Sequence, residues 1–107
     1  MSFDVERVSH ELIAALQPLL PRIQRRDRAL AVQLARAASS VSLNISEANY
    51  SDPGNRRARF CTAAGSANET RSALRVATAW GYLREPELHG PLILLDRILA
   101  MLWKLTH

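Results

Sequence analysis

Apolar side chains recur every three or four positions along almost the whole chain. This spacing places them on one face of an α-helix, and the alternating apolar and polar runs that are typical of strands do not occur. Clusters of proline, glycine, asparagine and aspartate divide the pattern into segments, which predict helices over residues 3–20, 27–49, 56–82 and 87–106. Because every segment has helical spacing, we predict an all-α fold. A length of 107 residues favours a single domain over residues 1–107. We predict an antiparallel up-down-up-down four-helix bundle.

Prolines and an aspartate set the expected limits of these helices. Asp27 is the predicted N-cap of the second helix, because its carboxylate can accept a hydrogen bond from a free backbone amide. Pro18 is expected to kink the first helix or to end it, since proline lacks the amide proton that a helix interior needs. Pro86 suits a first helical turn, whereas Pro91 predicts a distorted fourth helix or one that begins near Gly90.

Small residues occupy the middle of the second and third predicted helices, where they would let the two backbones approach closely. Gly65 predicts a close crossing, because a mid-helix glycine costs about 1 kcal/mol relative to alanine. If the connection turns at residues 52–53, Ser40 faces Gly65. In the same register Arg36 is expected to pair with Glu69.

Polar side chains, from Gln33 to Glu47, form a stripe beside the apolar face of the second predicted helix. Such a stripe could hold catalytic acids and bases, but hydrogen-bonded networks beside a bundle core are more common. We therefore predict a structural polar network of Arg36, Ser40, Asn44, Glu47, Ser66 and Glu69.

The charge balance is basic, with 14 lysines and arginines against 10 acidic residues and a net charge of +4. All but Lys104 are arginines, whose planar guanidinium binds phosphate through two hydrogen bonds. A GC-rich genome also encodes arginine in place of lysine, and a net charge of this size does not by itself require nucleic acid. Two clusters at opposite ends of the predicted bundle nonetheless predict nucleic-acid binding: Arg25, Arg26 and Arg28 beside Arg22, and Arg56, Arg57 and Arg59. The alternative is a solvated charged rim, because a monomer would have no continuous basic face.

Residues that carry chemistry are few. Cys61 has no second cysteine for a disulfide or a structural zinc site, and in the predicted register it packs against Asn44. None of the three histidines follows a glutamate by three positions, as di-iron bundles require, and no glycine loop for phosphates or dinucleotides is present. We therefore predict no enzyme activity, no cofactor and no metal site.

Nothing in the sequence predicts a membrane segment. The longest stretches without a charged side chain are no longer than the one from Leu12 to Pro21, whereas a membrane-spanning helix needs about 20 apolar residues. The first residues also lack the basic-then-apolar order of a secretory signal. The cytoplasm is the predicted compartment.

The fourth predicted helix is apolar over an arc of roughly 200°, which exceeds the arc of about 100° that packing inside one bundle needs. Leu94 and Met101 lie at one margin of this arc and Trp103 at the other. A contiguous apolar strip of this kind usually marks an interface, so these three residues predict a homo-oligomer. The alternative is that the first helix or the Pro91 region covers the strip within one chain.

Two motifs resemble those of the small bacterial four-helix bundle proteins first known from intervening sequences of 23S ribosomal RNA genes. The second-helix signature of that family is matched by Gln33, Arg36, Ala37, Ala38, Ser40, Asn44, Ile45 and Glu47. The third-helix pattern and its closing G-Y-L are matched by Phe60, Ala63, Gly65, Ser66, Glu69, Leu74 and residues 81–83. The family's usual arginine, proline and glycine are replaced by Ala35, Ser42 and Ala48, which removes one positive charge and predicts a straighter second helix.

The resemblance implies a ring-like homopentamer. In a related branch, the accessory protein of diversity-generating retroelements, the basic pentamer surface binds nucleic acid and a reverse transcriptase. The leading hypothesis is therefore a non-enzymatic oligomeric module that binds RNA, DNA or a nucleoprotein partner through rings of arginines at its ends. The alternative is a structural or protein–protein adaptor with no nucleic-acid role.

Overall fold

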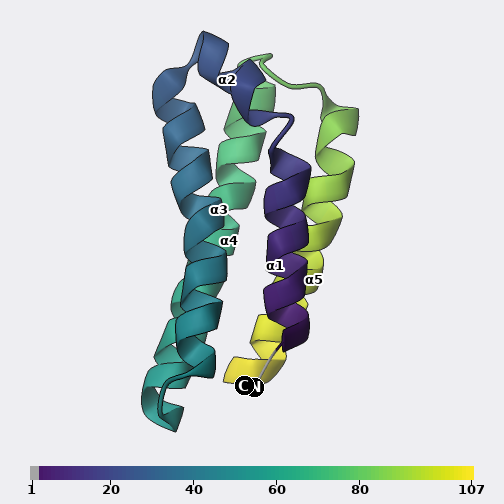
Figure 1. The fold of residues 1–107 in the computed structure, drawn as a ribbon. Helices are drawn as coiled ribbons and strands as arrows, with labels where there is room; N and C mark the ends of the chain where they lie inside the picture. The colour runs from purple at the N-terminus through teal and green to yellow at the C-terminus, as the bar shows by residue number, and fades with distance from the viewer. Residues whose placement is uncertain (1–2) are drawn as a thin grey trace.

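The computed structural model describes residues 3–107, which form five α-helices and one 3-10 helix (Figure 1). In chain order these are α1 (Phe3–Leu16), α2 (Leu20–Arg26), α3 (Arg28–Asn49), α4 (Pro53–Ala79), the 3-10 helix η1 (Glu85–Leu88) and α5 (His89–Thr106). The all-α prediction is confirmed, and the described residues contain no strand. The predicted count of four helices is wrong, because α2 lies in the segment that the prediction left as a connection between the first two helices.

The break in the first predicted helix, residues 3–20, lies at Pro18. α1 ends at Leu16, and α2 carries Pro21 in its first turn. A backbone amide there has no acceptor within the helix, so proline costs no helical hydrogen bond at this position. A helix of 7 residues is too short to be stable alone. α2 is held in place by its contact with α3 and by Ile23, which is fully buried.

Aspartates cap the next two helices. The Asp27 carboxylate accepts a hydrogen bond from the backbone amide of Leu30 at 3.0 Å, so the predicted cap is confirmed. Asp52 accepts from the backbone amide of Asn55 at 3.0 Å and from its side chain at 2.8 Å. These bonds hold the pKa of Asp52 below its ordinary value, so this cap is ionised at neutral pH. α4 starts directly after this cap, earlier than the predicted start at residue 56.

Gly81 ends α4 in the left-handed conformation, with a φ angle of 82°. Its amide donates to the carbonyl of Thr78 at 2.9 Å, and the amide of Tyr82 donates to the carbonyl of Ala77 at 2.8 Å. This Schellman arrangement satisfies carbonyls that a helix end leaves free. It also turns the chain sharply, which is why α4 ends at Ala79 rather than at residue 82.

The predicted close crossing at Gly65 is wrong. Gly65 is exposed on α4, and no atom lies within 4 Å of the position that a Cβ would take. Ser40 faces Ser66 instead, with 2.8 Å between the two hydroxyl oxygens. The register is therefore one position further along α4 than the sequence predicts.

These two glycines give a matched test of the backbone. We expect Gly81→Ala to lower the free energy of unfolding by about 1–2 kcal/mol, because an L side chain in the left-handed region meets its own backbone. Gly65→Ala is expected to raise it by about 0.5–1 kcal/mol, since alanine favours a helix interior and has room there. Urea unfolding followed by circular dichroism measures both values, and equal effects at the two positions would contradict these assignments.

Neither proline in the last third of the chain distorts a helix. Pro86 lies in the first turn of η1, as predicted. α5 begins at His89, so Pro91 also falls within a first turn, where backbone amides have no helical acceptor. The Pro91 ring is buried.

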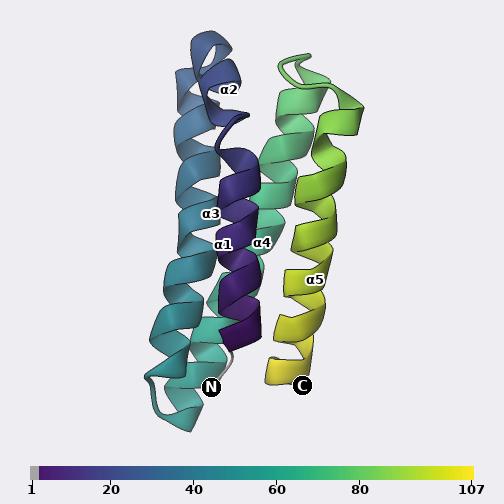
Figure 2. The same ribbon diagram turned by 45° about the vertical axis from the view of Figure 1, so that its right-hand side comes forward.

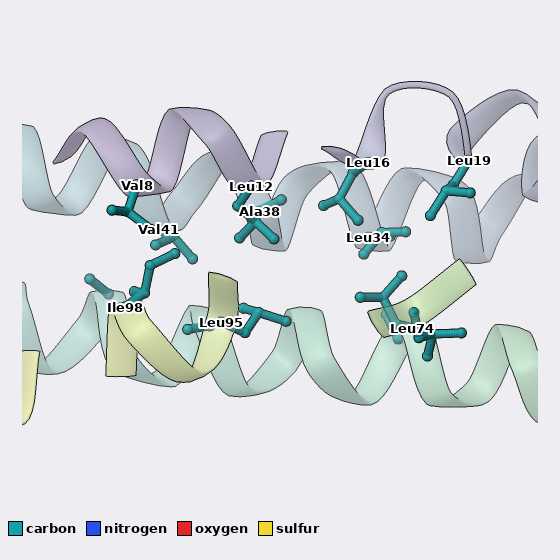
Figure 3. Packing of buried hydrophobic residues seen from close by; sticks show 14 of the residues in the cluster. Val8, Leu12, Leu16, Leu19, Leu34, Ala38, Val41, Leu74, Leu95 and Ile98 are labelled. Atoms are coloured by element: carbon teal, nitrogen blue, oxygen red, sulfur yellow. The ribbon is translucent and has the colours of Figure 1, made fainter. Parts of the chain in front are cut away.

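The four longer helices lie side by side around one apolar core, and α2 lies at one end beside α3 (Figures 1 and 2). α1 and α4 each contact both α3 and α5, which places α3 and α5 on opposite sides of the molecule. The core interleaves leucine with smaller side chains (Figure 3), among them Val8, Leu12, Leu34, Ala38, Val41, Leu74, Leu95 and Ile98. The connection after α4 lies at the same end as α2, and the α3–α4 turn lies at the other end of this 42 Å long molecule.

Candidate nucleic-acid interface

A groove of about 420 Å³ lies where α2 meets the connection that follows α4. We call it the basic groove, and it is lined by Arg22, Arg25, Arg26, Gly81, Tyr82 and Arg84. The spacing of three and four along α2 brings its arginines to one side of that helix. The turn at Gly81 adds the tyrosine and the fourth arginine from a distant part of the sequence.

Tyr82 joins the two walls of the basic groove. The Arg26 guanidinium lies over the Tyr82 ring, with its carbon 5.4 Å from the ring centroid. The Tyr82 hydroxyl donates to Asp27 at 3.4 Å. The indole of Trp80 lies nearly parallel to the Tyr82 ring, with 6.4 Å between the ring centroids. Arg26, Tyr82 and Trp80 thus form a row of neighbouring flat groups.

The charge of the basic groove is only partly compensated. Arg22 forms an ion pair with Glu87, and the backbone amide of Arg84 also donates to this carboxylate at 2.9 Å. Both hydrogen bonds, that of Arg22 foremost, hold the pKa of Glu87 below its ordinary value, so the pair stays charged at neutral pH. Among residues 3–107, no acidic side chain forms an ion pair with Arg25, Arg26 or Arg84. These three guanidiniums give the groove a net positive charge.

Arg28, which the sequence groups with Arg25 and Arg26, does not line the basic groove. It is exposed at the first position of α3, just after the Asp27 cap. The structure therefore separates it from the arginines of α2.

The second arginine cluster contacts the chain itself. Arg56 donates to the carbonyl of Ala48 near the end of α3 and to that of Ser51 in the following turn, at 3.3 Å each. Arg57 donates to the carbonyl of Thr106 at the end of α5 at 3.1 Å. Arg59 pairs with Glu47 at 3.0 Å. Cations at helix C-termini satisfy free carbonyls and favour the helix dipole. These contacts give the cluster a structural role, and its binding of nucleic acid stays a prediction.

Part of the predicted polar network is present between α3 and α4. The Asn44 side chain donates to the carbonyl of Ser40 at 2.9 Å and contacts the Ser40 hydroxyl at 3.0 Å, and that hydroxyl meets Ser66. The hydroxyl of the buried Thr70 donates to the carbonyl of Ser66 at 2.8 Å. Sequence reasoning missed Thr70, although its spacing of four from Ser66 was a usable signal.

The charged members of the predicted network lie outside it. Arg36 and Glu69 are exposed and form no ion pair with each other, so that prediction is wrong. The shifted register puts the buried Thr70, rather than Glu69, opposite Arg36. Glu47 pairs with Arg59 instead, along an open groove of about 550 Å³ that Arg36 also lines.

The predicted interface residues of α5 differ in exposure. Leu94 and Met101 are partly buried and pack against the core, whereas Trp103 is 61% exposed and stacks on His107. α5 packs against both α1 and α4. Much of the expected apolar strip is thus covered within the chain, and Ile93 and Trp103 remain outside the core.

Cys61 is exposed rather than packed against Asn44. It lines a shallow groove of about 340 Å³ together with Trp103 and His107. Within residues 3–107, no three histidine, cysteine or acidic side chains gather closely enough to hold a metal ion. The same part of the chain has no helix with the length and apolar character needed to cross a membrane.

Comparison with known proteins identifies the family. Residues 2–104 match the 23S rRNA-intervening sequence proteins. The chain belongs to this family. A crystal structure of a protein of unknown function from the S23 ribosomal protein family of Bacteroides thetaiotaomicron is similar over 95% of this chain and 97% of that one, with a TM-score of 0.87 and 19% sequence identity. At this identity the likeness shows the fold alone, and no curated protein matches.

In this 23S rRNA-intervening sequence protein, the arginine clusters noted in the sequence include Arg22, Arg25 and Arg26. These are three of the four arginines that line the basic groove. Sequence reasoning missed Arg84, Tyr82 and Trp80. The G-Y-L segment was noted only as part of the family pattern, although two aromatic residues flanking a glycine near an arginine were visible in the sequence. Only the fold shows that this segment lies against α2.

Proposed function

We propose that this family member is a non-enzymatic module that binds RNA or DNA, and that the basic groove is its contact surface. The observation that carries the proposal is the convergence of Arg25, Arg26 and Arg84 on one groove, where none of their guanidiniums forms an ion pair within residues 3–107. A nucleic-acid backbone presents phosphates, which guanidinium groups bind through paired hydrogen bonds. The ring of Tyr82 also restrains Arg26, which reduces the conformational freedom that binding would otherwise cost.

The proposal takes the four longer helices as an antiparallel up-down-up-down bundle with one arginine cluster at each end. The molecule is 42 Å long, whereas charges in physiological salt interact over about 8 Å. The two ends of one chain would therefore act independently. Arg25, Arg26 and Arg84, which form no ion pair in the described part of the chain, favour binding at the α2 end. At the other end, Arg56 and Arg57 instead stabilise the fold.

Removal of the groove charges tests this function. We expect Arg25→Ser, Arg26→Ser and Arg84→Ser together to weaken binding to RNA and DNA oligomers at low salt by about tenfold or more, and to lower the salt slope by about one per lost phosphate contact. Fluorescence anisotropy over a salt series measures both quantities.

The matched control removes the same number of charges elsewhere, with Arg7→Ser, Arg97→Ser and Lys104→Ser. This variant is expected to retain most of the affinity, because these exposed side chains lie on α1 and α5 and do not line the basic groove. Equal losses in the two variants would mean that net charge alone drives binding. No binding by the unaltered chain at micromolar concentration would favour the adaptor function.

Self-association is the second part of the proposal, and exposed apolar side chains support it. Leu43 on α3 is 64% exposed and Ile93 on α5 is 60% exposed. Because α3 and α5 lie on opposite sides, a contact between these faces would join different surfaces of two copies, and such contacts form a ring when the rotation from copy to copy closes. We propose a homo-oligomer, with the pentamer implied by the family resemblance. A light-scattering mass near 11.9 kDa would contradict it, and a mass five times larger would support the pentamer.

A ring would place five basic grooves on one rim, which increases affinity for a long phosphate backbone through multivalent contact. A nucleic-acid-processing protein, such as a reverse transcriptase, is the proposed protein partner, and the cytoplasm is the proposed location. The adaptor function stays the alternative, because the same exposed apolar faces would serve contacts between proteins without any nucleic acid.

A further inference from the structure

Trp80 is an unusual residue to leave in solvent. It is 67% exposed at the end of α4, immediately before the glycine that turns the chain. A tryptophan in such a position gives up the large favourable free energy that burial of its ring would supply. The Trp80 ring is therefore available for a flat partner from outside the chain.

The surroundings of Trp80 indicate the chemistry of that partner. Its ring lies beside Tyr82, which in turn carries the Arg26 guanidinium, and Arg25 and Arg84 line the same groove. An exposed aromatic ring next to a positively charged groove is the arrangement that binds single-stranded nucleic acid, because the groove contacts the phosphates and the ring stacks on an unpaired base.

We propose that Trp80 is a base-stacking platform and that the basic groove selects single-stranded over double-stranded nucleic acid. The selection follows from access, since bases in a duplex are already stacked and paired and offer only their edges. Stacking is tolerant of sequence because every base has a flat face, so we expect little preference among bases. This inference rests on the proposed function, because the phosphate contacts of the basic groove bring the strand to Trp80.

Three oligomers of equal length separate stacking from charge: a single-stranded RNA of mixed sequence, its duplex, and an abasic phosphodiester that has phosphates but no bases. We expect the chain to bind the single strand most tightly. Trp80→Ala should weaken this binding by about 5- to 100-fold, while its affinities for the duplex and the abasic oligomer stay nearly constant.

Trp103→Ala is the matched control, because Trp103 is a similarly exposed indole on another helix that stacks on His107 rather than on Tyr82 of the basic groove. It should leave the ratio of single-strand to duplex affinity unchanged, even where it alters self-association. In a Trp103→Phe chain, Trp80 is the remaining indole, and its fluorescence should be quenched by the single-stranded RNA but not by the abasic oligomer.

The outcomes distinguish this inference from the proposed function. Equal binding of all three oligomers, unchanged by Trp80→Ala, would overturn the stacking role and leave phosphate binding intact. Absence of binding to every oligomer at micromolar protein would overturn both. A loss of duplex and single-strand affinity in equal proportion in Trp80→Ala would show that Trp80 only supports the shape of the groove.

Discussion

Leu94→Glu together with Met101→Glu is expected to destabilise the folded chain strongly rather than only to separate its copies. Both side chains are partly buried and pack against the core. The substitutions remove apolar burial and bring two carboxylates against apolar neighbours, at a combined cost of about 3–5 kcal/mol. The total stability of a domain of this size is about 5–15 kcal/mol, so the loss would be severe.

Ile93→Glu together with Trp103→Glu is the contrasting variant on the outer face of the same helix. Both side chains are about as exposed as Trp80, so each change is expected to alter the free energy of unfolding by about 0.5 kcal/mol or less. If the outer face forms the interface, this variant stays folded by circular dichroism and its mass by light scattering falls to that of one chain. A Leu94 and Met101 variant that stays folded but becomes monomeric would instead place the interface at those residues.

Phe60→Ala is expected to lower the free energy of unfolding by about 3–5 kcal/mol, through lost transfer energy and an unfilled cavity. Phe60 is the largest of the fully buried side chains and is 1% exposed. It lies in the first half of α4, towards the α3–α4 turn and away from the basic groove. The affinity of the folded fraction for RNA should therefore stay the same.

Tyr50→Ala is the control for this change, because Tyr50 is an exposed aromatic residue at the end of α3, and its removal is expected to cost about 0.5 kcal/mol or less. Urea unfolding by circular dichroism gives the stabilities, and anisotropy under native conditions gives the affinities. A drop in affinity per folded molecule in Phe60→Ala would contradict the independence of the two ends.

The helices that the sequence predicted well are those whose signals are local. Asp27 caps α3 as expected, and Pro18 ends α1 as expected, because both effects depend only on a few neighbouring backbone groups. α2 was missed because a helix of this length has little stability of its own. Ile23 in the core keeps it helical, and this contact exists only in the folded chain.

Pairings between α3 and α4 were less predictable. The approximate register brought Ser40 close to Ser66, but an error of one position was enough to misplace Arg36 and Glu69, since one residue rotates a helical side chain by about 100°. The arginines of residues 56–59 looked free in the sequence. Arg57 contacts the carbonyl of Thr106, which comes from a distant segment, and Arg56 contacts the end of α3 across the turn, so these structural roles emerge only after folding.

By itself, the sequence determined the all-α class, most helix limits and the family, because periodicity, caps and motifs are written in consecutive residues. The tertiary structure alone decided which arginines share a groove, since Tyr82 and Arg84 reach α2 only through the turn at Gly81. The tertiary structure also decided which apolar residues of α5 remain outside the core. The coverage of a helix face depends on neighbouring helices, and α1 and α4 supply that coverage from remote parts of the chain.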